Sequence, residues 1–535
     1  MTKIQISKPY LKFVYWNLGF IWNLGFIWNL EFGIWDLFEM SQNFPALIIV
    51  VPLLSAFIIS AVGWLNKKLC FPIAVMALGM SLYSAVGLMG MVLESGVIEY
   101  RLGGWTPPWG IAYNVDHLNG LVLIVVFLVA LLNLIANKRA VEEEFPEKTG
   151  AFYTLYILFV TGLSGMVITG DAFNLYVLLE IASLTGYALI GIGKDRGALS
   201  SLNYLLMGTI GASLYLLGIG YLYLATGSLN MADLASILPK LCGSKIVLFA
   251  YALCLTGLFV KMAFFPLHAW LPNAYSYAPS MSSSLIAPLT TKVMIYVMIR
   301  ITLSVFTPQF SFDTLNISGP IVWMAVIAIV MGSLLALSQK SLKKTLTYVV
   351  VAEVGYMVGG FWLGNRAGMS GAILHIVNDA MMTLCIFLAA GTILYKTKGD
   401  SFDDLKGLFK KMPFSMAAFV IGAMSIIGVP PTCGFFSKWY LISGGIAAGH
   451  YGFVAALLFS SLVNVVLFFR IIEICYYEPF ADHHHHEKEE SSWDEAPAGM
   501  VIPLLMTAIL LIVLGIYSGD IVTHIIAFAI PGGIT

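Results

Sequence analysis

Three lysines of this sequence lie inside apolar stretches, each close to a proline. Lys261 precedes Pro266 by five residues, Lys292 follows a proline by one helical turn, and Lys438 follows the pair Pro430-Pro431. A cation in hydrocarbon costs about 2.5–3.5 kcal/mol on an insertion scale, and a proline leaves a helical carbonyl without its donor. Both are tolerated at membrane depth where they are buried in protein or line a wet cavity. The pattern therefore indicates proton or ion transfer within a membrane.

Acidic and imidazole side chains in other apolar stretches could supply the matching acid–base groups. Glu180 has apolar neighbours on both sides, Glu353 lies in a second apolar run, and His375 and Asp379 are four residues apart on one face of a helix. Burial raises the pKa of a carboxyl group and lowers that of a lysine, so a Glu–Lys pair in a damp cavity can exchange protons near neutral pH. A static ion pair that fixes helix packing is the alternative interpretation.

His268 lies seven residues after Lys261, about two helical turns along. Histidine titrates near neutral pH, so His268 could relay protons between half-channels. A hydrogen bond in the loop before Trp270 explains it equally well. Arg300 and Arg470 lie toward helix ends, where long side chains can reach the membrane interface.

Membrane helices must position these residues. The 535-residue chain is 59% hydrophobic and only 11% charged, which no soluble globular class resembles. Apolar runs of membrane-spanning length recur along it. We count about fourteen, at 46–64, 71–93, 117–136, 151–170, 173–192, 201–225, 245–264, 279–305, 318–337, 345–364, 370–395, 413–447, 452–477 and 500–530. The sequence predicts an all-α polytopic membrane protein in which helices 7 and 12 are broken.

An acid in one helix and a lysine two helices later, beside a break, occur twice. Glu180 precedes Lys261 in this way, and Glu353 precedes Lys438. Helices 4–8 and 9–13 are therefore predicted to be two inverted five-helix repeats, since five is odd. The expected organisation is an aromatic extension at 1–39, helices 1–3 at 40–145, the first repeat at 146–310, the second repeat at 311–480, and a His/acid-rich loop with the last helix at 481–535.

Residues 1–39 repeat a Trp-Asn-Leu-Gly-Phe-Ile unit with a period of six, which fits neither a helical stripe nor an alternating strand. We interpret them as an upstream in-frame extension before Met40. An interfacial aromatic segment is the alternative, because tryptophan favours the membrane–water boundary. His483 to His486 have flanking acids and could bind a transition metal, but a solvated loop needs none, and we predict no metal site.

Loop charges predict the orientation of the helices. Most lysines and arginines outside the apolar runs lie in loops after odd-numbered helices, whereas loops after even-numbered helices hold only Arg101, Lys240, Lys245 and Arg366. The positive-inside rule makes the first set cytoplasmic and puts both ends of the membrane domain outside. Three lysines in residues 1–39 then fall on the wrong side, a second reason to regard these residues as an extension.

The cysteines and the net charge reduce the number of function classes that the sequence could support. The six cysteines, Cys70, Cys242, Cys254, Cys385, Cys433 and Cys475, show no C-x-x-C spacing and mostly lie in apolar runs. We therefore expect core residues and neither an iron–sulfur centre nor any other cofactor. The net charge of −1 gives no indication of a nucleic-acid partner.

At its charged positions the chain resembles the antiporter-like subunits shared by Mrp-type sodium/proton antiporters, respiratory complex I and membrane-bound hydrogenases. The resemblance lies in Lys261-Met-Ala-Phe-Phe-Pro-Leu-His-Ala-Trp-Leu-Pro272, Thr291-Lys-Val-Met-Ile-Tyr296, Leu342-Lys-Lys-Thr-Leu-Thr-Tyr348 and Gly428-Val-Pro-Pro-Thr-Cys-Gly-Phe-Phe-Ser-Lys438. The resemblance extends from about residue 42 to 530. Within the family the chain looks most like the D-type Mrp subunit, because about fourteen helices account for its length and no lateral helix or extra domain is expected after them.

The resemblance implies a proton path through the membrane centre. It makes Glu180 the helix-5 glutamate, Lys261 the helix-7 lysine, Lys292 the bridging helix-8 lysine and Lys438 the terminal helix-12 lysine, and it matches His375 to a family histidine. Many relatives carry a lysine where this chain has Thr383, a histidine where it has Asp379 and a lysine where it has Asn203. Asp379 could instead favour a cation, or accept a hydrogen bond from His375.

Two functions follow from the resemblance. The first is a proton- and cation-translocating subunit of a multisubunit Na⁺/H⁺ antiporter in a prokaryotic plasma membrane, with other membrane subunits, H⁺ and Na⁺ as its partners. The alternative is a proton-pumping subunit of a redox-driven complex, such as a membrane-bound hydrogenase or a quinone reductase, whose partners hold the clusters. A stand-alone small-molecule transporter is a third interpretation. In none of them does this chain hold a catalytic redox site.

Overall fold

Long apolar helices make up most of the chain in the computed structural model, which describes residues 41–241, 243–477, 493–532 and 534. Twelve of the described helices are long and apolar enough to cross a membrane. They are α3 (Phe44–Leu65), α4 (Cys70–Ser95), α5 (His117–Glu144), α6 (Thr149–Ile168), α7 (Ala172–Gly191), α8 (Gly197–Thr226), α12 (Ser280–Arg300), α13 (Ser318–Leu337), α14 (Leu342–Trp362), α15 (Arg366–Thr397), α19 (Tyr451–Tyr477) and α20 (Ala498–Ile516).

Two further passes are interrupted, as the prolines predict. Helix α10 (Lys245–Lys261) ends at the lysine itself and a short helix, α11 (Leu271–Tyr277), follows the turn that contains Pro266. Helix α17 (Pro413–Ile427) ends at Gly428, whose φ of 94° is a left-handed conformation that favours glycine. Helix α18 (Cys433–Ala447) resumes after Pro430-Pro431. With these two passes the described chain has the fourteen expected from the sequence.

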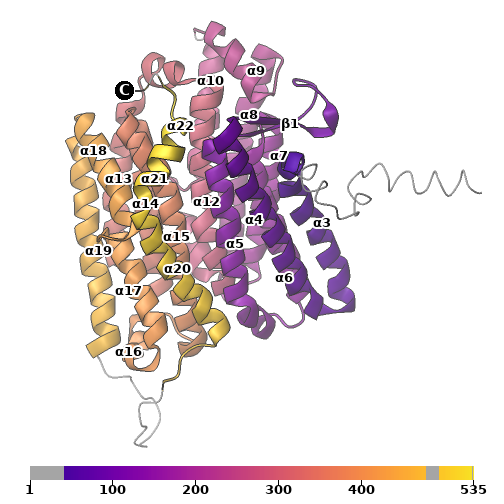
Figure 1. Cartoon of the computed structure of the whole chain (residues 1–535). Coiled ribbons are helices and arrows are strands. Elements are labelled where there is room, and N and C mark those ends of the chain that lie inside the picture. The colour runs from indigo at the N-terminus through magenta and orange to yellow at the C-terminus, as the bar shows by residue number, and fades with distance from the viewer. Residues whose placement is uncertain (1–40, 242, 478–492, 533, 535) are drawn as a thin grey trace, which may run out of the picture.

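Short elements cap the bundle at its two ends. Strands β1 (Ile98–Arg101) and β2 (Ala112–Val115) form an antiparallel hairpin in which Ile98 pairs with Val115. Helix α9 (Met231–Ile237) lies on the same side of the molecule as this hairpin, and α16 (Leu408–Lys411) lies at the opposite end (Figure 1). After α20 the chain continues through α21 (Ser518–Ile521), a π-helical turn (Val522–Ile526) and α22 (Ala527–Ala529).

Both ends of the described chain lie on one side of the bundle. The Tyr100 hydroxyl in β1 donates to Asn43, just before α3, over 3.1 Å. On the same side His117 at the start of α5 stacks on Phe528 of α22, with ring centroids 5.1 Å apart. An even number of crossings requires this arrangement. The orientation relative to the cytoplasm stays a prediction from the loop charges.

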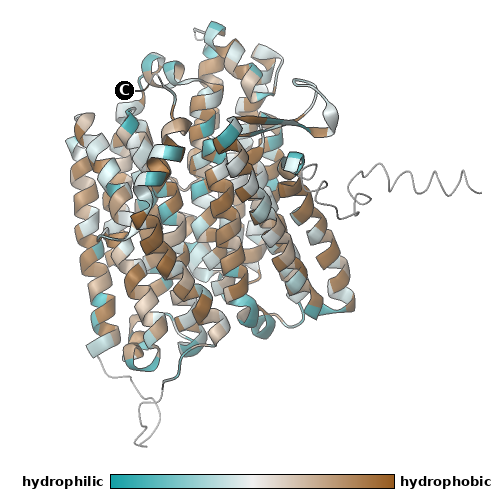
Figure 2. Ribbon diagram, viewed as in Figure 1, coloured by the Kyte–Doolittle hydropathy of each residue, from teal (hydrophilic) through white to brown (hydrophobic). Residues whose placement is uncertain are grey.

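The distribution of hydrophilic residues distinguishes the two ends of the helix bundle from its middle, and burial distinguishes its inner helices from its outer ones. Hydrophilic residues gather at the two ends of the bundle, whereas the middle is mostly apolar (Figure 2). Helix α15 is buried along its whole apolar length, and α12 and α14 nearly so, while α3, α4 and α8 expose most of theirs. The structure confirms an all-α polytopic membrane protein. Four of the predicted relay residues, Lys292, Glu353, His375 and Asp379, lie on these buried inner helices.

The two interrupted passes occupy matching places in the order of the helices. Each is the fourth pass of its five-helix unit, α6 to α12 for the first unit and α13 to α19 for the second. This is the placement that the sequence predicts for inverted repeats. The boundaries proposed at residues 40, 146, 311 and 481 stay predictions, and residues 1–39 lie outside the described residues.

Candidate functional site

A buried ion pair joins the two five-helix units at the centre of the bundle. Lys292 Nζ of α12 lies 2.8 Å from Asp379 Oδ2 of α15. The side chains are only 2% and 1% exposed. Two charges removed from water in this way require close contact and further hydrogen bonds, and the surroundings supply them.

Thr383 is one of these partners. Its hydroxyl donates to Asp379 Oδ1 over 2.8 Å and accepts from Lys292 over 3.3 Å. Lys292 also lies 3.3 Å from the carbonyl oxygen of Ala287. Thr383 is therefore part of the cluster. Asp379 contacts Lys292 and Thr383, and no hydrogen bond to His375 is formed within the described chain.

His375 lies one turn before Asp379 on the same helix and contacts a different carboxylate. Its Nε2 is 2.5 Å from Glu353 Oε2 of α14, and its Nδ1 is 2.8 Å from the Ser437 hydroxyl of α18. All three side chains are buried, and the second oxygen of Glu353 has no protein partner among the described residues. A carboxylate–imidazole contact of this length can pass a proton between the two groups.

Lys438 lies near this cluster among neutral groups. Its Nζ donates to the carbonyl oxygens of Ile426 (2.6 Å) and Ile427 (3.4 Å) at the end of α17, and to the Ser461 hydroxyl (3.3 Å). Carbonyls at a helix C-terminus attract cations. Among the described residues no ion pair joins Lys438 to Glu353. The expected Glu353–Lys438 pair is therefore not in direct contact, because Glu353 is bonded to His375.

Lys261 is buried at the C-terminus of α10. It donates to the Ser183 hydroxyl over 2.7 Å and to the Tyr187 hydroxyl over 3.4 Å, both on α7. Glu180, one turn before Ser183, is half-buried and close enough to Lys261 to interact electrostatically, but the described chain shows no ion pair between them. Lys261 and Glu180 are therefore near each other, as predicted, but the direct hydrogen bonds of the Lys261 ammonium go to the Ser183 and Tyr187 hydroxyls.

His268 lies in the turn between α10 and α11, half-buried and stacked on Phe265 with ring centroids 5.0 Å apart. Its Nδ1 has no protein hydrogen-bond partner within the described residues. Trp270 instead donates to the carbonyl oxygen of Val260, over 3.1 Å. In the part of the chain that the structure describes, no hydrogen bond or ion pair joins His268 to the Lys292 cluster.

The position of Arg300 near a helix end suggested a side chain that reaches freely to the membrane interface. In the structure it is bonded to other side chains instead. Its guanidinium contacts both oxygens of Asp116, the residue that caps α5, at 2.6 and 2.9 Å, and contacts the Tyr296 hydroxyl at 3.2 Å. This contact ties the end of α12 to the start of α5. Arg470 is exposed on α19, and no ion pair to Glu473 forms within that described helix.

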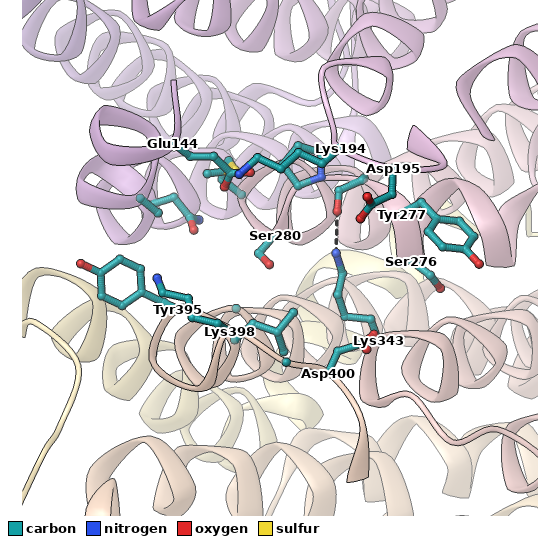
Figure 3. A pocket seen from close by; sticks show the side chains of 18 of the residues that line it. Glu144, Lys194, Asp195, Ser276, Tyr277, Ser280, Lys343, Tyr395, Lys398 and Asp400 are labelled. Carbon is teal, nitrogen blue, oxygen red and sulfur yellow. Dashed lines mark hydrogen bonds between the residues drawn. The ribbon is translucent and has the colours of Figure 1, made fainter. Parts of the chain in front are cut away.

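A cavity of about 840 Å³ opens where the two units meet, on the side that the loop charges make cytoplasmic (Figure 3). Four acids and four lysines line it: Glu143, Glu144, Asp195, Asp400, Lys194, Lys343, Lys344 and Lys398. The sequence assigned Lys343 to a loop. The structure buries it in the first turn of α14, because Ser341 caps that helix, and its Nζ donates to the carbonyl oxygen of Ala278 over 2.5 Å.

No group of three or more His, Cys, Asp or Glu side chains that could hold a metal ion occurs in the part of the chain that the structure describes. His483 to His486 lie outside the described residues. The buried side chains that sequence reasoning missed are Lys343, Thr383 as a bonding partner, and Tyr356, which contacts both His375 and Lys438. Only the three-dimensional packing brings these together, so no local pattern identifies them.

Comparison with known proteins gives consistent matches. Residues 169–464 match the family described as NADH:quinone oxidoreductase/Mrp antiporter, TM. The chain is 40% identical over 505 residues to the N-type subunit of the NADH-quinone oxidoreductase of Desulforudis audaxviator, which covers 92% of this chain and 99% of that protein. It is 31% identical over 435 residues to the D-type subunit of the Na(+)/H(+) antiporter of Bacillus subtilis, which covers 80% and 86%.

Two solved structures share the fold. One is a chain of the membrane-bound sulfane sulfur reductase, an archaeal respiratory membrane complex, with a TM-score of 0.81, 31% identity, and coverage of 90% of this chain and 96% of that chain. The other belongs to the Mrp complex from Dietzia sp. DQ12-45-1b, with a TM-score of 0.81, 24% identity, and coverage of 91% and 96%. The second match shows the fold alone.

Proposed function

Because this chain belongs to the NADH:quinone oxidoreductase/Mrp antiporter transmembrane family, we propose that it is a proton- and cation-translocating membrane subunit of a multisubunit Na⁺/H⁺ antiporter. In this proposal buried glutamates, lysines and a histidine relay protons between the two five-helix units. The similarity to the D-type antiporter subunit of Bacillus subtilis supports it. The membership also confirms the resemblance inferred from the motifs.

The observation that carries this proposal is the Lys292–Asp379 ion pair, with His375 one turn away and bonded to Glu353. Two acid–base contacts on one helix connect groups from α12, α14 and α15. At an effective dielectric constant of about 20, unit charges about 4 Å apart interact by about 4 kcal/mol. A proton that arrives at Asp379 therefore frees Lys292 from its counter-ion, and a charge on His375 is felt at both carboxylates.

The proposed path begins in the first five-helix unit and ends in the second. In the first unit, Lys261 exchanges protons with Glu180 through the hydroxyls of Ser183 and Tyr187. Lys292 bridges to the second unit, where His375 and Glu353 carry the proton toward Lys438. His268 stays a proposed relay residue at the break that ends α10, where its ring nitrogen, unpartnered among the described residues, is able to bond to water.

The cavity between the units offers access for water from the side predicted to be cytoplasmic. Along α12 and the first turn of α14, the hydroxyls of Ser282, Thr291 and Thr345 are buried without a partner in the described chain. Buried polar groups of this kind are usually satisfied by ordered water. Met281 and Lys344 line the cavity beside these helices. We propose that water reaches Lys292 by this route.

Partner subunits complete the proposal. Glu180 shares the outer face of α7 with Phe173, Val177 and Leu184, which are exposed apolar side chains. A carboxylate that faced lipid at mid-helix would cost several kcal/mol. A neighbouring membrane subunit that covers this face would remove that cost. This agrees with the solved relatives, which are parts of multisubunit membrane complexes.

A second function is favoured by one specific observation. The 40% identity to the N-type subunit of an NADH-quinone oxidoreductase extends over nearly the whole of both chains. A proton-pumping subunit of a redox-driven complex would use the same buried groups, with cluster-bearing partners supplying the electron chemistry. Genes for small Mrp-like membrane subunits beside this one favour the antiporter, and genes for cluster-binding subunits favour the pump.

Everted membrane vesicles that contain the whole complex test the proposal. Proton flux driven by a Na⁺ gradient without an electron donor supports the antiporter, whereas flux that requires a donor supports the redox-driven pump. Lys261→Ala and Glu180→Gln should each abolish the flux while the complex still assembles. Full flux in either variant, with normal assembly, would contradict the relay. Loss of the protein from the membrane would instead indicate that these residues have a purely structural role.

A further inference from the structure

Tyr356 of α14 lies beside both the His375 and the Lys438 side chains. Its ring centroid is 5.5 Å from that of His375, and Lys438 Nζ lies 5.0 Å from it. The ring is fully buried. Its hydroxyl donates to Ser460 over 2.6 Å, and Ser460 is hydrogen-bonded to Ser333, also at 2.6 Å. Two serines from α19 and α13 therefore fix the plane of a ring that contacts two proposed relay groups.

The surroundings of Lys438 explain why this ring matters. In the described chain Lys438 makes no ion pair, and its other contacts are two carbonyl oxygens and one hydroxyl. Its stem packs closely on Gly428, where an added Cβ would lie 3.2 Å from Lys438 Cδ. Lys292, in contrast, has a carboxylate partner. The aromatic face of Tyr356 thus adds negative potential to that of the two carbonyl oxygens beside the Lys438 ammonium.

We propose that Tyr356 is a positioning residue of the proton relay, whose ring face holds the charged Lys438 side chain beside His375. This inference rests on the proposed function, because it acts through Lys438. The face of an aromatic ring attracts a cation through its quadrupole, and this attraction strengthens when both groups are desolvated.

A fluorination series built on phenylalanine, in which every member lacks the hydroxyl that bonds to Ser460, tests the ring electrostatics at nearly constant packing. The whole complex is produced with phenylalanine or its mono-, di- and trifluorinated analogues at position 356, through amber suppression, and proton flux is measured in vesicles at equal protein levels. Each fluorine withdraws electron density from the ring face at nearly constant volume. We expect flux to fall stepwise, to about one tenth of the phenylalanine value for the trifluoro ring.

Two matched controls separate this inference from the proposed function. The same series at Phe361, a buried ring on the same helix that packs against Phe312 and Trp362, should show no trend. Lys438→Met should abolish flux. Equal flux across the Tyr356 series, with Lys438→Met inactive, would overturn the inference and leave the relay standing. Full flux in Lys438→Met would overturn both.

Discussion

Lys292 and Asp379 form an ion pair that links α12 to α15, with 2.8 Å between Nζ and Oδ2. Each residue comes from a different five-helix unit, so this contact joins the two units through a pair of opposite charges. Breaking a buried pair by removal of one partner typically costs about 3–5 kcal/mol, whereas replacing both by apolar residues can be neutral.

The first prediction uses this asymmetry. Asp379→Leu alone should destabilise the complex by about 3–5 kcal/mol, because Lys292 keeps a buried charge without its partner. The double variant Lys292→Met with Asp379→Leu should recover most of the stability and none of the flux. Melting temperatures of the solubilised complex, together with vesicle flux, check this. A double variant no more stable than the single one would show that the pair does not act as a unit.

The second prediction concerns the hydroxyls that hold Lys261. The combined variant Ser183→Ala with Tyr187→Phe removes both hydrogen-bond partners from its ammonium. A hydrogen bond to a charged group contributes about 1.5–3 kcal/mol, so we expect flux to fall about tenfold or more. Thr185→Val on the same helix, whose hydroxyl bonds only to backbone carbonyls of α7, is the control. Unchanged flux in the combined variant would remove these hydroxyls from the path.

The third prediction grades the contacts of His375. Glu353→Gln removes the carboxylate that contacts Nε2, and Ser437→Ala removes the hydroxyl that contacts Nδ1. A neutral hydrogen bond contributes about 1 kcal/mol, so Ser437→Ala should slow transport about fivefold. Glu353→Gln should stop it, because an amide cannot accept a proton. Flux measurements at equal expression decide the order, and a larger effect from Ser437→Ala would reverse the assigned roles.

The fourth prediction concerns Asp116, which lies outside the spanning segments. Burial alone raises the pKa of Asp116, but the charge of Arg300 and hydrogen bonds from Arg300 and two backbone N–H groups outweigh it, so its pKa is lowered. A lowered pKa in the folded state contributes stability above the unfolded value of about 3.9, and that stability is lost as the pH falls through the folded value.

Arg300→Ala should therefore lower the stability of the complex at pH 7 by about 2–3 kcal/mol. The difference from the parent should narrow as the pH falls below about 4. Melting temperatures across this range measure it. Lys67→Ala is the control, because Lys67 makes an exposed ion pair with Glu147 and such pairs contribute about 0–1 kcal/mol. A difference that stays constant with pH would assign the effect to lost packing.

The fifth prediction concerns the break in the second unit. A Cβ at Gly434 would lie 1.9 Å from the carbonyl oxygen of Ser425 and 2.9 Å from Met382 Sδ. Gly434→Ala must therefore push α18 away from α17, and overpacking of this kind costs about 1–3 kcal/mol. Gly79→Ala on α4, where a Cβ meets nothing within 4 Å, should be harmless. Equal amounts of assembled complex from both variants would show that the break is loosely packed.

The sequence alone is sufficient to predict the membrane helices and the two places where they are interrupted. Long apolar runs need no tertiary information, and Pro266 and Pro430 mark the interruptions because proline cannot continue a helical hydrogen-bond ladder. The i, i+4 spacing of His375 and Asp379 correctly places both on one face of α15. Lys292 could be expected to be buried for the same reason, since its neighbours on α12 are apolar.

The partners of these charges could not be predicted, because each contact joins different helices. Glu353 was expected to approach Lys438, and it bonds to His375 instead. Lys343 has lysine-rich neighbours in sequence and so resembles a loop residue, but the cap at Ser341 turns it into the bundle. Tyr356 lies in an apolar run like many other tyrosines. Only the packing of α14 against α15 and α18 gives it a role.

Helix α15 has one mechanical consequence. His375 and Asp379 lie about 6 Å apart along its axis, at about 1.5 Å per residue, and both contacts belong to one rigid rod. A tilt or slide of α15 that lengthened the contact with Lys292 would shift the contact with Glu353 at the same time. The shape of α15 therefore couples the two contacts. A movement that changes the distance between Lys292 and Asp379 also changes the distance between His375 and Glu353.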